Sequence, residues 1–186
     1  MQQKRDQGFL WGLIMMGVLC ATAVVANSAK AASGNGPYYA TPSWDQTLPA
    51  ATRFIILSNF NNEAVLDRNT GLVWEQSPSA TVEPWGNARF TCLNKRVGNQ
   101  KGWRLPAVAE LASLVDPSVA IPGPTLPPDH PFTNVQSSIY WSASTFADNP
   151  TNAWFVNFGN GFVGTFSKIT TFPVWCVRGG GNADPY

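Results

Sequence analysis

Short apolar or alternating segments recur along the chain, and their lengths are typical of β-strands. Strands are predicted over residues 53–58, 64–67, 72–75, 139–144, 153–158, 162–167 and 172–178. The sequence Arg-Asn-Thr-Gly at 68–71 separates one pair of these strands, and Gly-Asn-Gly at 159–161 separates another. Because Asn and Gly tolerate positive φ, both sequences favour β-hairpins.

Two segments between the strands have helical spacing instead. Apolar residues recur three or four positions apart in 107–115, and Asp116-Pro117 ends that pattern. A second helix is expected over 85–97, where Trp85, Arg89 and Cys92 share one face. Residues 117–138 contain six prolines and no clear periodicity, so they predict a long loop. The order of elements predicts an α+β fold, with two helices packed on antiparallel strands.

The first 31 residues have the three parts of a secretory signal peptide. Lys4 and Arg5 precede the uncharged run Phe9–Ala26, and Ala29-Lys30-Ala31 supplies small residues for cleavage after Ala31. A retained membrane anchor is the alternative, because the apolar run approaches the ~20 residues that span a bilayer. In either case the protein is expected to be exported, to the periplasm or out of the cell.

The length of 186 residues fits one domain with extensions at both ends. Residues 32–52 are small, polar and rich in proline, which favours a flexible linker. The domain is predicted over 53–180, and residues 181–186 are expected to form a frayed tail.

The charge of the chain is nearly balanced, with 12 Lys and Arg against 11 Asp and Glu. Removal of the leader leaves 9 basic and 10 acidic residues. A near-neutral domain lacks the basic surface that nucleic acid requires, so we expect no nucleic-acid partner. The single histidine, His130, excludes a metal site with two histidine ligands from this chain.

Two cysteines follow the leader, Cys92 in the first predicted helix and Cys176 in the last predicted strand. In an exported protein such a pair favours one disulfide, and two buried thiols are the alternative.

Five basic residues fall within sixteen positions that contain no Asp or Glu, namely Arg89, Lys95, Arg96, Lys101 and Arg104. Guanidinium groups form paired hydrogen bonds with oxyanions, so this cluster suits sulfated or carboxylated glycans. The alternative is a solvated helix face, with Arg104 in an internal ion pair.

A series of short motifs occurs in a fixed order: Asp67–Trp74 (DRNTGLVW), Cys92, Gly102–Pro106 (GWRLP), Glu110-Leu111, Tyr140–Ser144 (YWSAS), Ala153-Trp154 and Trp175–Gly179 (WCVRG). This series resembles the Lcl C-terminal domain family, named from bacterial collagen-like adhesins, and covers roughly residues 53–180. The resemblance implies a C-type lectin-like fold, shared with the formylglycine-generating enzymes, and export from a bacterium. Some members of the family are adhesin tips.

Calcium-dependent lectins carry the triplets Glu-Pro-Asn or Gln-Pro-Asp and Trp-Asn-Asp, and this chain has none of them. Asp148-Asn149-Pro150 is the nearest approximation, so the resemblance implies neither calcium nor another cofactor. Asp67-x-Asn69-x-Gly71 has the start of a calcium loop but lacks the distal Glu, which favours a tight turn instead.

The predicted function is noncatalytic recognition of a glycan or a protein at the bacterial envelope or outside the cell. The predicted ligand site consists of Arg89, Arg96, Lys101, Asp148, Asn149 and Asn152. One alternative is an envelope enzyme near the long loop, with His130 and Ser142 or Ser144, or with carboxylates such as Glu110 and Asp116. The other is a structural component that binds only proteins. A membrane is expected as a partner only through an uncleaved leader.

Overall fold

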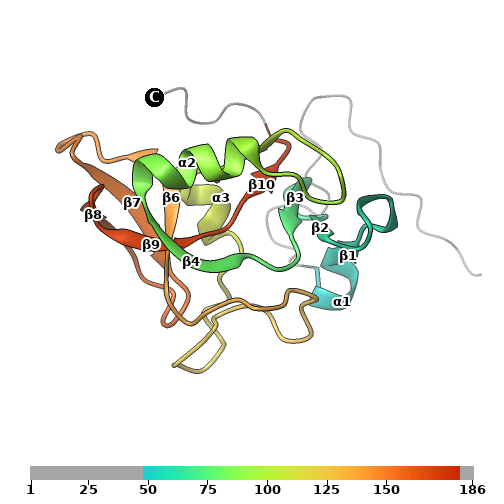
Figure 1. Cartoon of the computed structure of the whole chain (residues 1–186). Helices are drawn as coiled ribbons and strands as arrows, with labels where there is room; N and C mark the ends of the chain where they lie inside the picture. The colour runs from blue at the N-terminus through green and yellow to red at the C-terminus, as the bar shows by residue number, and fades with distance from the viewer. Residues whose placement is uncertain (1–47, 181–186) are drawn as a thin grey trace, which may run out of the picture. The chain divides into compact units, whose positions relative to one another are not determined.

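Antiparallel strands form three sheets in the computed structural model, which describes residues 48–180 (Figure 1). The first sheet has the order β1-β2-β3-β10-β5, formed by Phe54–Ile56, Ala64–Asp67, Leu72–Glu75, Val177–Arg178 and Trp103–Arg104. The second pairs β4 (Ser79–Pro84) with β9 (Thr171–Val174). The third has the order β6-β7-β8, formed by Ile139–Thr145, Asn152–Asn157 and Val163–Ser167. The predicted leader, residues 32–47 of the predicted linker and the predicted tail lie outside the described residues.

Both predicted hairpins are confirmed. β2 and β3 pair around a turn that ends in Gly71, with φ of 72°, and Asp67 lies opposite Leu72. β7 and β8 pair around the turn that contains Gly161, with φ of 77°. In both turns glycine occupies a conformation in which a side chain would be strained.

Both predicted helices are confirmed and are shorter than expected. α2 covers Trp85–Asn94, and its buried residues are Trp85, Ala88 and Cys92. α3 covers Val108–Ala112. Leu111 and Leu114 are fully buried, so the predicted apolar face of α3 and the turn that follows it packs into the core. Figure 1 shows the Pro-rich segment 117–138 as a long irregular loop, as predicted.

The structure differs from the sequence-based expectation at several places, one of which is the two-residue strand β5, which was not predicted. β4 was not predicted, because three of its residues in a row are exposed and it pairs with β9 alone. The predicted strand 172–178 is two strands, since the chain crosses from the second sheet to the first at Trp175-Cys176. Ala50–Thr52 were expected in the linker, whereas the structure places them in a short helix, α1 (Ala50–Arg53).

The core is rich in aromatic residues and is closed by one disulfide. Trp74, Trp103, Trp141 and Trp175 are fully buried, and each removes a large apolar area from water. The predicted Cys92–Cys176 disulfide is confirmed, with a Cα–Cα distance of 5.4 Å. It joins α2 to the crossover between β9 and β10, so the α+β class and its single bridge agree with the sequence. Within residues 48–180, no helix has the length and apolar character needed to cross a bilayer.

Candidate functional site

The five clustered basic residues of the sequence have different environments in the structure. Lys95 Nζ lies 2.6 Å from Glu75 Oε1. Arg104 donates two hydrogen bonds to the carboxylate of Glu110, at 2.7 and 2.6 Å. Lys95 and Arg104 therefore hold the fold together, and the internal ion pair considered for Arg104 is confirmed.

Arg96 and Lys101 follow α2 and lie in the segment that leads to β5. Arg96 lines a shallow hollow together with the carboxylates of Glu63 and Glu75. Lys101 is exposed and has no ion-pair partner among the described residues. Lys95 lines the same hollow, so its two cations are balanced by two acidic residues and leave no net charge to attract an anion.

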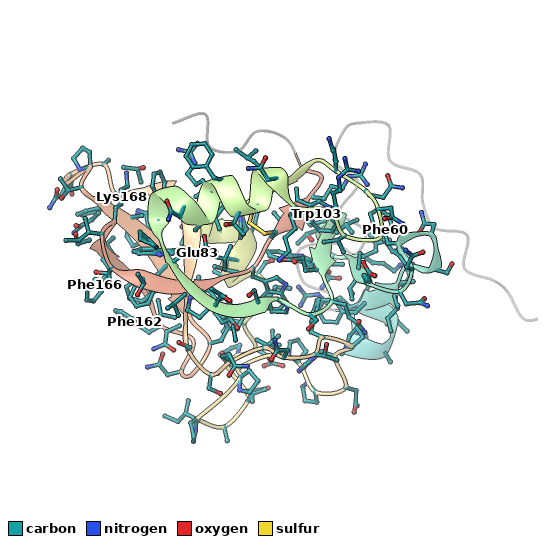
Figure 2. The ribbon with its side chains drawn as sticks, in the orientation of Figure 1. Phe60, Glu83, Trp103, Phe162, Phe166 and Lys168 are labelled. Atoms are coloured by element: carbon teal, nitrogen blue, oxygen red, sulfur yellow. A yellow bond between two sulfur atoms is a disulfide. The ribbon has the colours of Figure 1, made fainter. Side chains whose placement is uncertain are left out.

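Arg89 belongs to a different arrangement, in which two cations flank one tryptophan. The Arg89 guanidinium carbon lies 4.9 Å from the centre of the Trp85 ring. The Lys168 ammonium lies 4.0 Å from the same ring. Cations are attracted to the electron-rich face of an indole. We call Trp85, Arg89 and Lys168 the Trp85 cluster; Lys168, which lies between β8 and β9 (Figure 2), was not among the predicted site residues.

Hydrogen bonds connect the Trp85 cluster to the loop between β6 and β7. Lys168 Nζ donates to Thr145 Oγ1 at 2.9 Å, and the Lys168 backbone N–H donates to the Thr151 carbonyl at 2.9 Å. Within the loop, Asn149 Oδ1 accepts hydrogen bonds from the Thr151 N–H and hydroxyl. Asp148 and Asn149 are exposed there, and Asn152 begins β7. Lys168 thus contacts both α2, which carries the predicted residue Arg89, and the β6–β7 region. That region carries the other predicted residues, Asp148, Asn149 and Asn152.

The positive charges of the Trp85 cluster have no carboxylate partner among the described residues. Glu83, the acidic residue nearest in sequence to Trp85, accepts a hydrogen bond of 2.7 Å from the Thr91 hydroxyl instead. Burial lowers the pKa of Lys168, and the positive charge of Arg89 lowers this pKa further. Two cations that repel each other and have no ion-pair partner among the described residues favour the binding of an oxyanion.

Asp67 and Asn69 have a structural role in the β2–β3 turn. The Arg53 guanidinium donates to Asp67 Oδ1 and Oδ2 at 2.9 and 2.8 Å, and Asp67 is fully buried. The Asn69 backbone N–H donates to Asp67 Oδ1, which is the geometry of an Asx turn. Among residues 48–180, no group of three or more His, Cys, Asp or Glu side chains is arranged to hold a metal ion.

The residues considered for an enzyme have separate partners. His130 Nδ1 accepts a hydrogen bond from the Phe132 N–H, and burial lowers the pKa of His130. The Ser142 hydroxyl donates to the Trp154 carbonyl, and Ser144 Oγ accepts from the Val108 N–H.

The carboxylates considered for an enzyme are also engaged. Glu110 accepts two hydrogen bonds from Arg104, and Asp116 Oδ1 accepts from the N–H and hydroxyl of Ser118.

A family model, the Lcl C-terminal domain, matches residues 63–178. The chain belongs to the Lcl C-terminal domain family. The matched segment begins just before β2 and ends with β10, so it contains α2, the disulfide and the Trp85 cluster. A comparison with curated proteins finds no match.

The motifs shared with the Lcl C-terminal domain mainly build its scaffold. Trp74, Trp103 and Trp175 pack in the core, Arg104 and Glu110 form an ion pair, and the cysteines form the bridge. Arg89 and Lys168 lie outside these motifs. In this chain, the motifs that carry the resemblance are therefore distinct from the two cations beside Trp85.

Proposed function

We propose that this protein is a noncatalytic binding module that recognises a sulfated or carboxylated glycan at the Trp85 cluster. The observation that carries the proposal is the pair of cations, Arg89 and Lys168, that flank Trp85 without an acidic partner among the described residues. Charge-assisted hydrogen bonds to an oxyanion would replace the missing counter-charge.

The neighbouring loop supplies polar groups for the rest of such a ligand. Asp148 and Asn149 are exposed beside Thr151, whose carbonyl accepts the Lys168 N–H. Amide and carboxylate side chains are suited to sugar hydroxyl groups because they accept and, for Asn, also donate hydrogen bonds. A glycan bound at Arg89 and Lys168 therefore has further contacts within reach.

We infer that the protein acts outside the cytoplasm and has a C-type lectin-like fold. The leader sequence and the Cys92–Cys176 disulfide support export, since such bridges persist in oxidising compartments. Support for the fold comes from family membership and from the first sheet, where β10 joins the N-terminal strands.

A glycan array read at two salt concentrations tests the proposed ligand class. We expect binding to sulfated or carboxylated glycans at low salt, with weaker binding at high salt because ions screen exposed charges. The variants Arg89→Gln and Lys168→Gln should each weaken binding at least fivefold. Thermal unfolding of both variants establishes that they remain folded.

Lys101→Gln is the matched control, because it removes the same charge from an exposed position after α2. It should bind like the unchanged protein. A blank array contradicts the glycan proposal and favours a protein partner. Equal losses in all three variants would show that binding follows net charge, which contradicts the assignment to the Trp85 cluster.

A further inference from the structure

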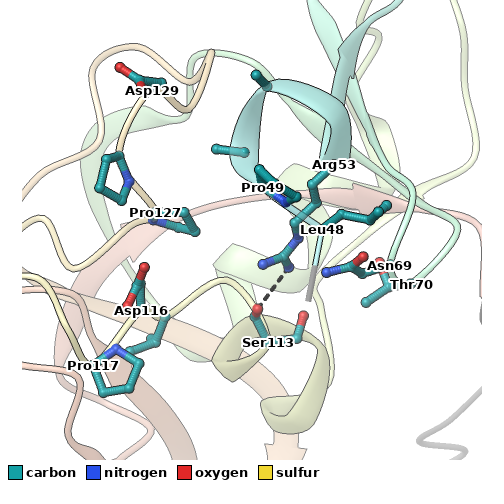
Figure 3. Close-up of a pocket in the computed structure, with 14 residues that line it drawn as sticks. Leu48, Pro49, Arg53, Asn69, Thr70, Ser113, Asp116, Pro117, Pro127 and Asp129 are labelled. Atoms are coloured by element: carbon teal, nitrogen blue, oxygen red, sulfur yellow. Dashed lines mark hydrogen bonds between the residues drawn. The ribbon is translucent and has the colours of Figure 1, made fainter. Parts of the chain in front are cut away.

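A second candidate site is a cavity of about 760 Å³ beside α1 (Figure 3). Its walls come from α1, the β2–β3 turn, the segment after α3 and the long loop. This volume is within the range of about 300–1,000 Å³ that small-molecule sites occupy. None of the elements that form the Trp85 cluster lines this cavity, so any ligand here goes beyond the proposed function.

The cavity carries an excess of negative charge. Arg53 lines it, but the Arg53 guanidinium is neutralised by Asp67 and also donates to the Ser113 carbonyl at 2.8 Å. Asp116 and Asp129 also line it, and neither forms an ion pair among the described residues. Two carboxylates thus remain to attract a cation.

The positions of the polar groups suit a ligand with more than one polar end. Figure 3 shows Asp116 and Asp129 on one side of the cavity and Asn69 on the other. Asn69 Oδ1 is buried and has no hydrogen-bond partner among the described residues. A buried acceptor without a donor is costly, and rotation of the Asn69 amide would turn this oxygen towards a ligand N–H group in the cavity that Asn69 lines.

The remaining wall is aliphatic. It includes Leu48, Pro49, Val115, Pro117, Pro127 and Pro128. No aromatic side chain is among the described residues that line the cavity, so the stacking surface that a sugar ring prefers is missing. Methylene groups gain from contact with such a wall, whereas a small inorganic cation does not.

We propose that this cavity binds an aliphatic diamine or polyamine. Ammonium groups pair with Asp116 and Asp129, and the methylene chain lies against the proline and leucine side chains. A terminal N–H group reaches Asn69 on the opposite side.

Calorimetric titration of the purified protein with putrescine and spermidine tests this proposal. Butane-1,4-diol is the neutral match for putrescine, since it has the same chain length without charge. We expect saturable binding of the amines and none of the diol. Backbone-amide NMR shifts should change at Asn69, Thr70, Ser113 and Asp129, which line the cavity.

Two isosteric variants remove one negative charge each. Asp129→Asn suits its position because Asp129 has φ of 63°, a conformation that Asn also adopts readily. Asp116→Asn keeps the oxygen that accepts from Ser118. Each should weaken spermidine binding at least fivefold, whereas Asp148→Asn, on the exposed β6–β7 loop, should leave it unchanged.

Three outcomes would overturn the proposal. The first is a titration without saturation, and the second is diol binding equal to that of putrescine. The third is a loss in Asp148→Asn as large as that in Asp129→Asn, which would indicate attraction to the net charge of the protein.

Discussion

Glu75 Oε2 accepts a hydrogen bond of 2.8 Å from the backbone N–H of Cys176, so the buried carboxylate on β3 contacts the disulfide-bearing crossover. The other oxygen of this carboxylate pairs with Lys95 at 2.6 Å. The Glu75 side chain is only 3% exposed. Burial raises the pKa of Glu75, and Lys95 and the Cys176 N–H oppose that rise. Lys95 thus stabilises the ionised form of the Glu75 carboxylate.

Lys95→Met is expected to destabilise the protein by about 2 kcal/mol at neutral pH, because it leaves a buried carboxylate without its cation. The pKa of Glu75 in the folded variant then lies still further above its unfolded value. Stability from such a group is present at low pH and is lost as pH rises through the folded pKa. The deficit relative to the unchanged protein should therefore shrink towards pH 4. Urea unfolding at several pH values measures it.

Lys101→Met is the control for this experiment, since Lys101 is exposed and unpaired among the described residues. Its effect should be small at every pH. A Lys95→Met deficit that does not change with pH would contradict the role assigned to Glu75.

Cys92→Ser is expected to lower the melting temperature by about 10 °C or more under non-reducing conditions. The bridge joins residues separated by 84 positions, and closure of a loop of that length stabilises by about 4 kcal/mol on the chain-entropy model. Differential scanning calorimetry measures the change. Addition of reductant should remove the difference between the two proteins, and an unchanged melting curve would exclude a structural bridge.

Arg53→Met is expected to cost about 3–5 kcal/mol, the range for breaking a buried ion pair from one side. Asp67 is fully buried and would lose both of its hydrogen bonds from the guanidinium. The double variant Arg53→Met, Asp67→Asn should recover part of this loss, because it removes the unpaired charge. Denaturant unfolding compares the variants.

Arg68→Met is the control for the Arg53 variant, because the Arg68 side chain is exposed and, among the described residues, donates only to the Thr52 carbonyl. Its unfolding free energy should change by less than about 1 kcal/mol. Equal effects of the two substitutions would contradict the importance of the buried pair.

The pH dependence of anion binding is expected to reflect Lys168. Burial and Arg89 lower the pKa of Lys168 below its ordinary value of 10.5. The ammonium therefore loses its proton at a lower pH than a free lysine does, and binding of a sulfated glycan should decline at alkaline pH. Lys168→Arg should keep binding at that pH, since the guanidinium remains charged. A pH profile identical for both proteins would contradict this role.

Most of the strands could be predicted from sequence because their signals are local. The hairpin at Gly159–Gly161 depends on adjacent residues, and buried and partly buried positions alternate at the start of β7. β4 could not be found in this way, because Ala80, Thr81 and Val82 are exposed and only pairing with β9 makes them a strand. The break between β9 and β10 was missed for a related reason. Phe172–Arg178 reads as one apolar run, and only the position of the sheets divides it.

Of the two cations in the Trp85 cluster, only Arg89 was predicted, because only Arg89 is close to Trp85 along the chain. Arg89 follows Trp85 by one helical turn, a spacing that sequence reveals. Lys168 reaches Trp85 through the packing of the β8–β9 connection against α2, which is a contact between distant segments. The useful signal was a lone lysine between two predicted strands, with no acidic residue nearby in the sequence. Lys168 was missed because it lies far along the chain from the other basic residues.

The order of strands in the first sheet has a consequence for when the protein can fold. β10, the last strand of the described chain, lies between β3 and β5 rather than at an edge. Until the ribosome has synthesised Val177 and Arg178, β3 and β5 lack the neighbour that both require. Cys176, the second half of the disulfide, is also made only at that stage. The nascent chain can therefore pair β1, β2 and β3 early, but β5 joins them only after the strand that links the two parts of the sheet has been made.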